Sequence, residues 1–535
     1  MNEKHAEKNR LEVFSAVIFL ISCIVFRMRT GDIGLGYMLV CFVFFEAMWI
    51  VFGRRVSDAV GNILWGRYLK QKFKSARLIW RYSLSMNFFT GFLVMLFLAI
   101  AGSYVIRDVF GLRHSYFLIL FFALYFLIKL MSETVGGHLC SRKKTSSVFG
   151  AFSVIRQTLI LVLGNISISL TEIYGNKVTA LLKQEDFGAV YSCIGILITA
   201  IVTEILVLTG LLGVKLLARQ KEIDYDDDFY HRKDNTGNVF LLVWKRRIYE
   251  AAGDLFTLIP VIAGLFIVFL HTKDSLKTAA DFGFLTVVMI VPACIVCFLG
   301  YFMLLPLVID IYTRFRKSSM GEARRMFNTG LHLCFVYGAF GAAFLIAQMK
   351  IISGIIGPAE ASAYERFIVY AAVCSVLLLP TLFVSRLLIL DGYVLYTYFV
   401  KIPANVIFFV VINIAIRRAA DPVRVLGASL LVFFICLFIG FIILAFTKLD
   451  MTVNPIICIL IPVLDAIVVC VINVFVSKLI SPHLGNVFTL LISFIEMAVL
   501  YIVLLLLSHN FKETEIKYLP AGRIVMLLGE TFRVF

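Results

Sequence analysis

Ionisable side chains interrupt several long apolar segments of this 535-residue sequence. Glu46 lies inside the apolar segment 35–53, and Arg156 lies near the start of the segment 150–170. A charge at bilayer depth costs a few kcal/mol, so it needs a partner, a watery cavity or a place near a helix end. The chemistry open to such groups is binding. A carboxylate can take up a proton or a cation, and a guanidinium can hold an anion through paired hydrogen bonds.

Glu46 is the first candidate for a residue that lines a substrate cavity, with a structural pair to a cation on a neighbouring helix as the alternative. Arg156 is the second, although its side chain can also extend to the inner membrane face. Arg27 and Arg29 close the first apolar segment. There they can meet an anionic group, since arginine grips phosphate oxygens in a bidentate manner, or simply anchor the helix at the interface.

Asp254 is a further cavity candidate. Glu46, Asp254 and Glu204 are the candidates for coupling to an ion, with snorkelling or ordinary pairing as the alternative for the last two. His332, alone on its segment, is expected to be a satisfied packing residue. Three further ionisable residues inside apolar segments are weaker cases: Arg386, Asp465 and Glu496.

The elements that must position these groups are membrane helices. The chain is 61% hydrophobic and 14% aromatic, with a mean hydropathy of +0.95, which excludes an ordinary soluble domain. Apolar segments of about 20 residues, enough to cross a bilayer, recur from end to end. We predict an all-α polytopic membrane protein with about fourteen spans, near 12–28, 35–53, 84–106, 115–131, 150–170, 187–214, 249–270, 282–311, 328–356, 367–390, 392–416, 425–447, 455–477 and 487–507.

The net charge of +16 follows the predicted topology. The richest basic segments, 54–81 and 215–247, each hold eight Lys and Arg residues, and both fall on the side of the N-terminus. This positive-inside bias predicts that both termini are cytoplasmic. It suits anionic membrane lipids and argues against nucleic acid as a partner.

Two windows of the sequence, 36–91 and 283–338, align without a gap. Their identities are mostly glycines and basic residues, which shared apolar composition would not place in register. A membrane protein with an internal repeat is most often a transporter that moves one half against the other. The repeat sets Ala293 opposite Glu46, and this broken symmetry favours Glu46 as a ligand-facing residue.

The longest polar stretch divides the chain after six predicted spans. We predict an N-terminal six-helix bundle at 1–217, a cytoplasmic linker at 218–248, a C-terminal six-helix bundle at 249–450, two added helices at 451–510 and a cytoplasmic tail at 511–535. The tail is either an amphipathic segment at the inner interface or a disordered basic tail.

Motifs for catalysis or metal binding are missing from the sequence. The acidic linker has the opening spacing of a calcium loop but lacks its glycine, so we expect no metal there. There is no phosphate-binding glycine loop, and no loop is long enough to fold an enzyme. We expect no catalytic residue, no metal and no cofactor, and hence no enzyme.

Three segments resemble the MOP superfamily of multidrug, oligosaccharidyl-lipid and polysaccharide exporters. They are GDIGLGYMLV at 31–40, the basic GRYLK and SARLIWR stretches within 66–81, and VRVLGASLLVFF at 423–434. With fourteen spans, the chain is most similar to the polysaccharide and lipid-intermediate flippase branch, which includes the stage V sporulation protein B type and the lipid II flippases.

The resemblance implies two six-helix bundles related by a pseudo-twofold axis, arranged in a V around a central cavity, plus two C-terminal helices. It implies a flippase that moves a polyprenyl-diphosphate-linked saccharide across the bacterial cytoplasmic membrane by alternating access, with glycosyltransferases or a polysaccharide synthase as partners. Cavity cations, namely Arg27, Arg29 and Arg156, would meet the diphosphate. Two alternatives stay open: a cation-coupled multidrug extruder of the same fold, and a non-transporting membrane subunit of a polysaccharide synthesis or secretion complex.

Overall fold

The computed structural model consists of helices joined by turns, and every regular element within its described residues is a helix. Thirteen of these helices are long and apolar enough to cross a membrane. The predicted all-α, multi-pass membrane class is therefore confirmed. The described residues are 3–70, 72–141, 145–183, 187–219, 237–316, 320–356, 361–390, 392–417, 421–448, 454–480, 485–508, 510–511, 513–516, 518–519 and 522–531.

The first two predicted spans correspond to two helices joined across a kink at Gly31. Helix α1 (Glu3–Met48) runs on through the π-helical turn η1 (Trp49–Gly53) to α2 (Val56–Leu69). It changes direction at Gly31, whose φ of 70° and ψ of −179° are suited to glycine. Each of the other twelve predicted spans coincides with one apolar helix. The fourteen predicted spans thus agree with thirteen observed helices.

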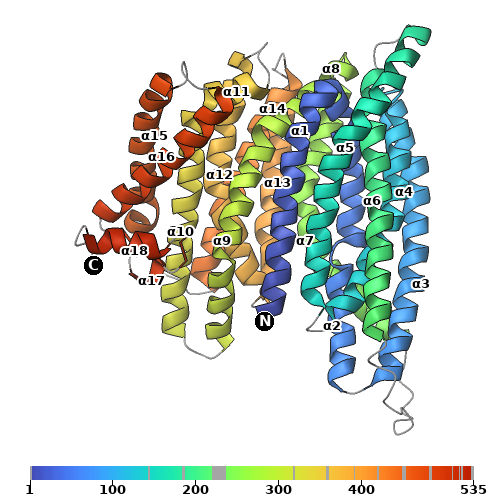
Figure 1. Cartoon of the computed structure of the whole chain (residues 1–535), viewed down its shortest axis with the longest axis horizontal. Coiled ribbons are helices and arrows are strands. Elements are labelled where there is room, and N and C mark those ends of the chain that lie inside the picture. The colour runs from blue at the N-terminus through green and yellow to red at the C-terminus, as the bar shows by residue number, and fades with distance from the viewer. Residues whose placement is uncertain are drawn as a thin grey trace. The chain divides into compact units, whose positions relative to one another are not determined.

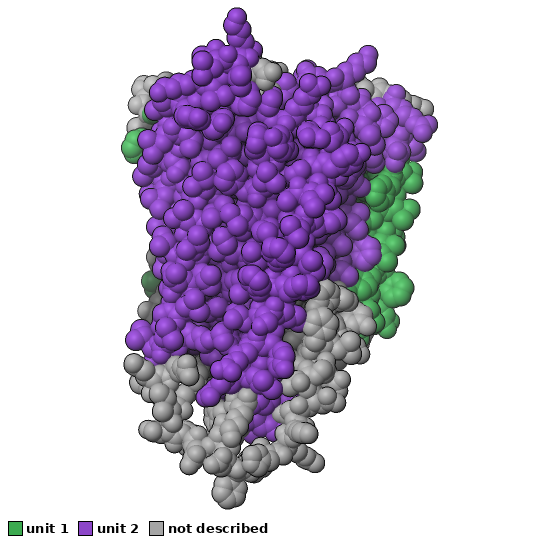
Figure 2. Space-filling view, turned by 90° about the vertical axis from the view of Figure 1, so that its right-hand side faces the viewer, with its two compact units in different colours: residues 1, 285–411, 427–535 green, residues 2–284, 412–426 purple. Residues whose placement is uncertain are grey.

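The described chain divides into two compact units, coloured separately in Figure 2. Unit 2 holds residues 2–284 and 412–426. In it, α5 packs along α6 and α1, while α4 packs against α6, α3 and α2, as Figure 1 shows. Besides α1 and α2, its elements are α3 (Phe73–Phe97), η2 (Leu98–Gly102), η3 (Val105–Val109), α4 (Tyr116–Cys140), α5 (Ser146–Leu182), α6 (Phe187–Arg219), α7 (Gly237–His271) and most of α8 (Ser275–Leu285).

Unit 1 holds residues 1, 285–411 and 427–535. Its centre is formed by α9, α10 and α12, and α15 packs against α10 and α16. Its elements, with α13 and α14 shared at their ends with unit 2, are η4 (Thr286–Ile290), α9 (Val291–Arg316), α10 (Met320–Ala347), α11 (Met349–Ile356), α12 (Ala361–Leu390), α13 (Val394–Ile416), α14 (Pro422–Lys448), η6 (Ile456–Leu460), α15 (Ile461–Ile480), α16 (Asn486–Leu507), α17 (Glu513–Ile516) and α18 (Gly522–Thr531).

The predicted domains follow the sequence repeat, whereas the compact units follow packing, and they place α7 and α8 with α1–α6. The predicted boundaries stay a prediction. Residues 220–236, the greater part of the predicted linker, lie outside the described residues, and so do Asp224, Asp226 and Asp228, which have the opening spacing of a calcium loop.

Two glycines that the sequence repeat superposes pack against each other inside unit 2. A Cβ atom on Gly283 would lie 2.8 Å from the backbone nitrogen of Gly36, and one on Gly36 would overlap the carbonyl oxygen of Ala279. Helices α1 and α8 therefore cross with their backbones in contact, which only glycine permits. The pseudo-twofold layout of the two halves itself remains a prediction.

Candidate functional site

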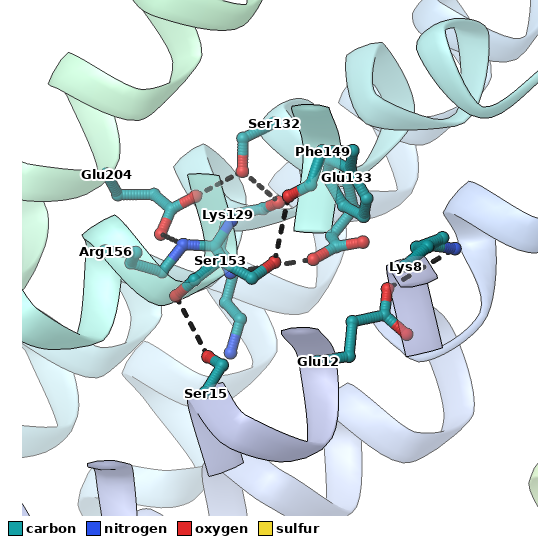
Figure 3. A network of polar contacts seen from close by, with 10 residues as sticks. All are labelled: Lys8, Glu12, Ser15, Lys129, Ser132, Glu133, Phe149, Ser153, Arg156 and Glu204. Atoms are coloured by element: carbon teal, nitrogen blue, oxygen red, sulfur yellow. Dashed lines mark hydrogen bonds and ion pairs between the residues drawn. The ribbon is translucent and has the colours of Figure 1, made fainter. Parts of the chain in front are cut away.

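Three helices of unit 2 place charged side chains in its interior, at positions where apolar residues surround them. Arg156 on α5 pairs with Glu204 on α6, with Nε 2.9 Å from Oε2, and only 6% and 0% of the two side chains are exposed. On its other side, Nη1 of Arg156 lies 3.7 Å from Oε1 of Glu133 on α4. Figure 3 shows Arg156 and Glu204 extending toward each other from adjacent helices.

The carboxylate of Glu204 is bound at both of its oxygens. While Oε2 faces Arg156, Oε1 accepts a hydrogen bond from the hydroxyl of Ser132 on α4. A buried ion pair needs such additional hydrogen bonds to offset the loss of hydration. One arginine thus connects α4, α5 and α6, and removing it would leave two carboxylates without their counter-charge.

Lys129 lies one helical turn before Glu133 on α4 and points its ammonium group at aromatic rings. Its Nζ is 4.4 Å from the ring centre of Trp49 and 5.4 Å from those of Phe45 and Tyr125. A desolvated cation–π contact of this kind is worth about 2 kcal/mol. The cage joins α4 to the end of α1 and to η1, and it brings a second cation beside Glu46, on which its charge acts.

The network continues from Glu46 to Asp254 on α7. The charges of Lys129 and Arg54 both act on Glu46. Asp254 Oδ2 lies 3.5 Å from Nη1 of Arg54 and 3.7 Å from Nη2 of Arg55. Arg55 has a left-handed φ of 68°, unusual for a residue other than glycine. This strained turn between η1 and α2 aims both arginines at α7.

Four of the predicted site residues therefore share one ionic network, which is buried at Arg156 and Glu204 and partly exposed at Asp254. The fourth residue is Glu46. We call the five groups at its centre the ionic cluster; they are Glu46, Lys129, Glu133, Arg156 and Glu204. Three carboxylates face two cations in it, so the cluster carries an excess negative charge unless a carboxylate is protonated. Such a group can bind a proton or a cation, or exchange partners when a helix moves.

A second charged contact, between a buried lysine and two partly exposed carboxylates, lies nearer the start of α1. Lys8, 1% exposed, has its Nζ 2.6 Å from Oδ1 of Asp58 on α2 and 3.3 Å from Oε1 of Glu12. Close by, the hydroxyl of Ser15 donates to the carbonyl oxygen of Ser153, at 2.9 Å. These contacts fix α1 against α2 and α5.

Arg27 and Arg29, predicted as a pair of cations, have different surroundings. Arg27 is 5% exposed, and its Nε lies 2.5 Å from Oδ1 of Asp32 across the bend at Gly31. Its guanidinium carbon is 5.5 Å from the ring centre of Phe284. Arg29 is exposed. Of the two, Arg29 is the cation open to a ligand.

Sequence reasoning missed Lys129 and Glu133. The predicted span 115–131 ended before Glu133 and placed Lys129 close to the interface, where a charge needs no explanation. The observed helix α4 extends to Cys140, so both residues lie well inside it. The available signal was their spacing of four, which puts a lysine and a glutamate on one helix face.

Comparisons with known proteins give a match by structure alone. No protein-family model matches the sequence, and no curated protein matches it. Among solved structures, the lipid II flippase MurJ in an inward closed conformation aligns with a TM-score of 0.54 and 14% identity, covering 93% of this chain and 99% of that one.

Multidrug transporters align about equally well. An inward-facing MATE family transporter of the MOP superfamily gives a TM-score of 0.54 at 13% identity, over 82% of this chain and 95% of that chain. The eukaryotic MATE transporter AtDTX14 gives 0.56 at 11% identity, over 84% and 97%. The chain therefore has the fold of MOP superfamily transporters, as its sequence motifs predicted.

Proposed function

We propose that this chain is a flippase that moves a lipid-linked oligosaccharide or polysaccharide intermediate across the cytoplasmic membrane by alternating access. The observation that carries the proposal is the extent of the structural match. The MurJ structure aligns with 93% of the chain, whereas the two MATE structures align with 82% and 84%. The difference, about a tenth of the chain, is the length of α15 and α16 together.

We assign different roles in the proposed flippase to different charged groups of unit 2. The exposed Arg29, next to the buried Arg27, is suited to the diphosphate of a lipid-linked sugar. Arg156 is already held by two glutamates, so it keeps α4, α5 and α6 in one arrangement until a proton or a competing anion releases it. Glu46 and Asp254, which share the charge of Arg54, are the ion-coupling groups.

The same contacts support the predicted orientation. Lys8, near the N-terminus, touches Asp58, which lies at the start of the basic segment 54–81. The N-terminus is thus at the same end of unit 2 as one of the two richest basic segments. By the positive-inside rule we place this end in the cytoplasm of the bacterial inner membrane.

A cation-coupled multidrug extruder is the second candidate. It is favoured by TM-scores of 0.54 and 0.56 to MATE structures, which equal or exceed the 0.54 to MurJ, and by the carboxylate excess of the ionic cluster. An organic cation in that case takes the place of the diphosphate, and Arg29 has no ligand to bind.

The test uses purified full-length protein in liposomes that carry a fluorescent polyprenyl-diphosphate saccharide. Movement between leaflets is followed as loss of fluorescence to an impermeant quencher. We expect movement with wild-type protein, and reduced movement with Arg29→Gln and Glu46→Gln. Arg107→Gln, which changes an exposed pair with Asp108, is the matched control and should behave as wild type.

The outcome separates the two candidates. No movement of the lipid above protein-free liposomes, together with ion-driven uptake of an organic cation that depends on Glu46, would replace the flippase by the extruder. Wild-type rates in both site variants would instead overturn the assignment of the residues while leaving the activity in place.

A further inference from the structure

The C-terminal end of the chain lies on the body of unit 1 through polar contacts. We call the described residues between Ser508 and Leu519 the C-terminal strap; Figure 1 shows its helix α17 near α10. Five hydrogen bonds or ion pairs connect it to α9, α10 and α15: Ser508 Oγ to Asp465 at 3.1 Å, Asn510 Nδ2 to His332 Nε2 at 3.0 Å, Glu515 Oε2 to His332 Nδ1 at 3.1 Å, Tyr518 Oη to Asp310 at 2.9 Å, and Tyr337 Oη to the carbonyl of Tyr518 at 3.2 Å.

His332 is at the centre of these contacts. It is 2% exposed, and the strap covers it with Asn510, Phe511 and Glu515, each no more than 4% exposed. The phenyl ring of Phe511 meets the imidazole edge to face, with centres 6.0 Å apart. Both ring nitrogens therefore contact strap residues. The protonation state of the imidazole therefore affects the free energy with which the strap docks on unit 1.

The two polar partners respond differently to a proton on His332. The carboxylate of Glu515 favours the imidazolium, because two buried opposite charges then neutralise each other. Asn510 accepts both states. Its amide nitrogen donates to an unprotonated Nε2, and its Oδ1, buried without a hydrogen-bond partner, becomes an acceptor for a protonated Nε2 when the amide rotates. Protonation thus strengthens the Glu515 contact without losing the Asn510 contact.

The helices packed against α10 supply no competing partner for His332 within the described residues. Asp310 on α9 accepts from Tyr518, Asp465 on α15 accepts from Ser508, and Glu496 on α16 accepts from Asn473. Among the described residues the ion pair of His332 is with Glu515. The other charged residues of these helices are Arg314, Arg316, Lys350, Glu365, Arg366, Arg386 and Lys478.

We propose that the C-terminal strap is a proton-controlled latch. With His332 protonated, its pair with Glu515 holds the strap across α9, α10 and α15. When His332 loses the proton, the carboxylate loses this counter-charge and the strap opens more readily. The latch is a property of unit 1 alone and does not depend on which substrate is transported.

The test is hydrogen–deuterium exchange of the purified full-length protein, read on peptides that cover 508–519 and corrected for the intrinsic effect of pH. Histidine side chains titrate between about pH 5 and pH 8. From about pH 6 to about pH 8 we expect strap protection to fall about tenfold, because the ion pair between the imidazolium and the Glu515 carboxylate becomes a hydrogen bond from a neutral imidazole. Peptides from α12, in the centre of unit 1, should keep their protection and report that the unit is folded.

Two variants make the result decisive. His332→Gln keeps a hydrogen-bonding side chain that cannot titrate in this range, and Glu515→Gln removes the charge from the strap itself. Both should abolish the pH dependence. His138→Gln, a change at a buried histidine of unit 2 near Tyr68, should retain it. Equal protection of the wild-type strap at both pH values, or persistence of the change in Glu515→Gln, would overturn the latch even if His332→Gln failed to fold.

Discussion

The two units bury their charges in different places. In unit 2, ion pairs connect the middle of α4, α5 and α6, where Arg156 holds two glutamates. In unit 1, the ion pairs between described residues join Arg314 to Glu322 and His332 to Glu515. The first is exposed, and the second forms where the C-terminal strap docks. Unit 2 thus buries charges inside its helix packing, whereas the buried ion pair of unit 1 joins α10 to the C-terminal strap.

This difference has an energetic meaning. A buried ion pair is costly to form and still more costly to break on one side, because the remaining charge stays without water. Because Arg156 pairs with carboxylates on two other helices, the arrangement of α4, α5 and α6 in unit 2 is expected to depend on protonation. In unit 1 the same dependence is confined to a strap, whose opening leaves the helices α9, α10 and α12 packed. Protonation is therefore expected to rearrange the interior of unit 2 but only the terminus of unit 1.

The largest expected effect comes from removing Arg156. Arg156→Met keeps the length of the side chain but leaves Glu204 and Glu133 unpaired, and we expect a loss of about 3–5 kcal/mol in the free energy of unfolding. The measurement is the thermal midpoint of the purified protein with retention of a monodisperse peak. Adding Glu204→Gln should recover part of the loss, because the pair is coupled. Arg107→Met, at an exposed pair, is the control and should leave the thermal midpoint close to that of the wild type.

If Arg156→Met is no worse than Arg107→Met, the charges of unit 2 do not hold its helices together. The contrast between the units would then rest on where charges lie and not on what they stabilise.

The next effect tests the glycine crossing of α1 and α8, which belongs to unit 2 alone. Gly36→Ala places a methyl group on the backbone of Ala279, and overpacking of this kind costs about 1–3 kcal/mol. Gly66→Ala is the matched control, since a Cβ there meets open space on α2, and it should be neutral or stabilising. Equal thermal midpoints for the two alanine variants would contradict the close crossing.

The apolar helices of the fold could be predicted because their length and composition are local properties of the chain. Even the kink at Gly31 falls in the gap between the first two predicted spans, which correspond to the two helices that meet there. Predictions based on single residues found the charges but not their partners. Asp254 meets Arg54 and Arg55 from 200 residues away, and a pairing of this kind leaves no local pattern.

Two contacts could not be predicted for the same reason. His332 is buried with both ring nitrogens bonded, in keeping with the satisfied packing residue that the sequence predicts, but its partner Glu515 lies in a tail predicted to be amphipathic or disordered. Lys129 was passed over because the predicted span ended two residues later. In both cases the missing information was how far the neighbouring segment stays ordered, which is set by contacts between helices and not by hydropathy.

A smaller effect is expected at Lys129, where variants can show whether the charges of unit 2 serve stability, activity or both. Lys129→Met keeps the apolar contact with Trp49 and loses the cation–π term, so we expect a loss of about 1–2 kcal/mol. The variant also removes a positive charge near Glu46. The rate of lipid movement in liposomes should therefore fall even when equal amounts of folded protein are compared. Lys129→Arg is the control and should retain most of both. Full activity in Lys129→Met would show that the aromatic cage is only structural.

The smallest expected effect concerns Tyr518, the strap residue that bonds to α9. Burial, together with its hydrogen bond to Asp310, raises the pKa of Tyr518 above its usual value. A raised pKa in the folded state means that the contribution of Tyr518 to docking is complete below about pH 10, the value for a free tyrosine, and is lost as the pH rises through the folded-state value.

Tyr518→Phe removes one hydrogen bond, at a cost of about 1 kcal/mol. Strap exchange should therefore rise about fivefold in the variant at neutral pH, while the dependence on His332 between about pH 6 and pH 8 persists. Loss of the pH dependence of strap exchange in Tyr518→Phe would mean that the strap opens cooperatively, starting at Tyr518. The latch would then have to be assigned to Asp310 and Tyr518 instead of His332.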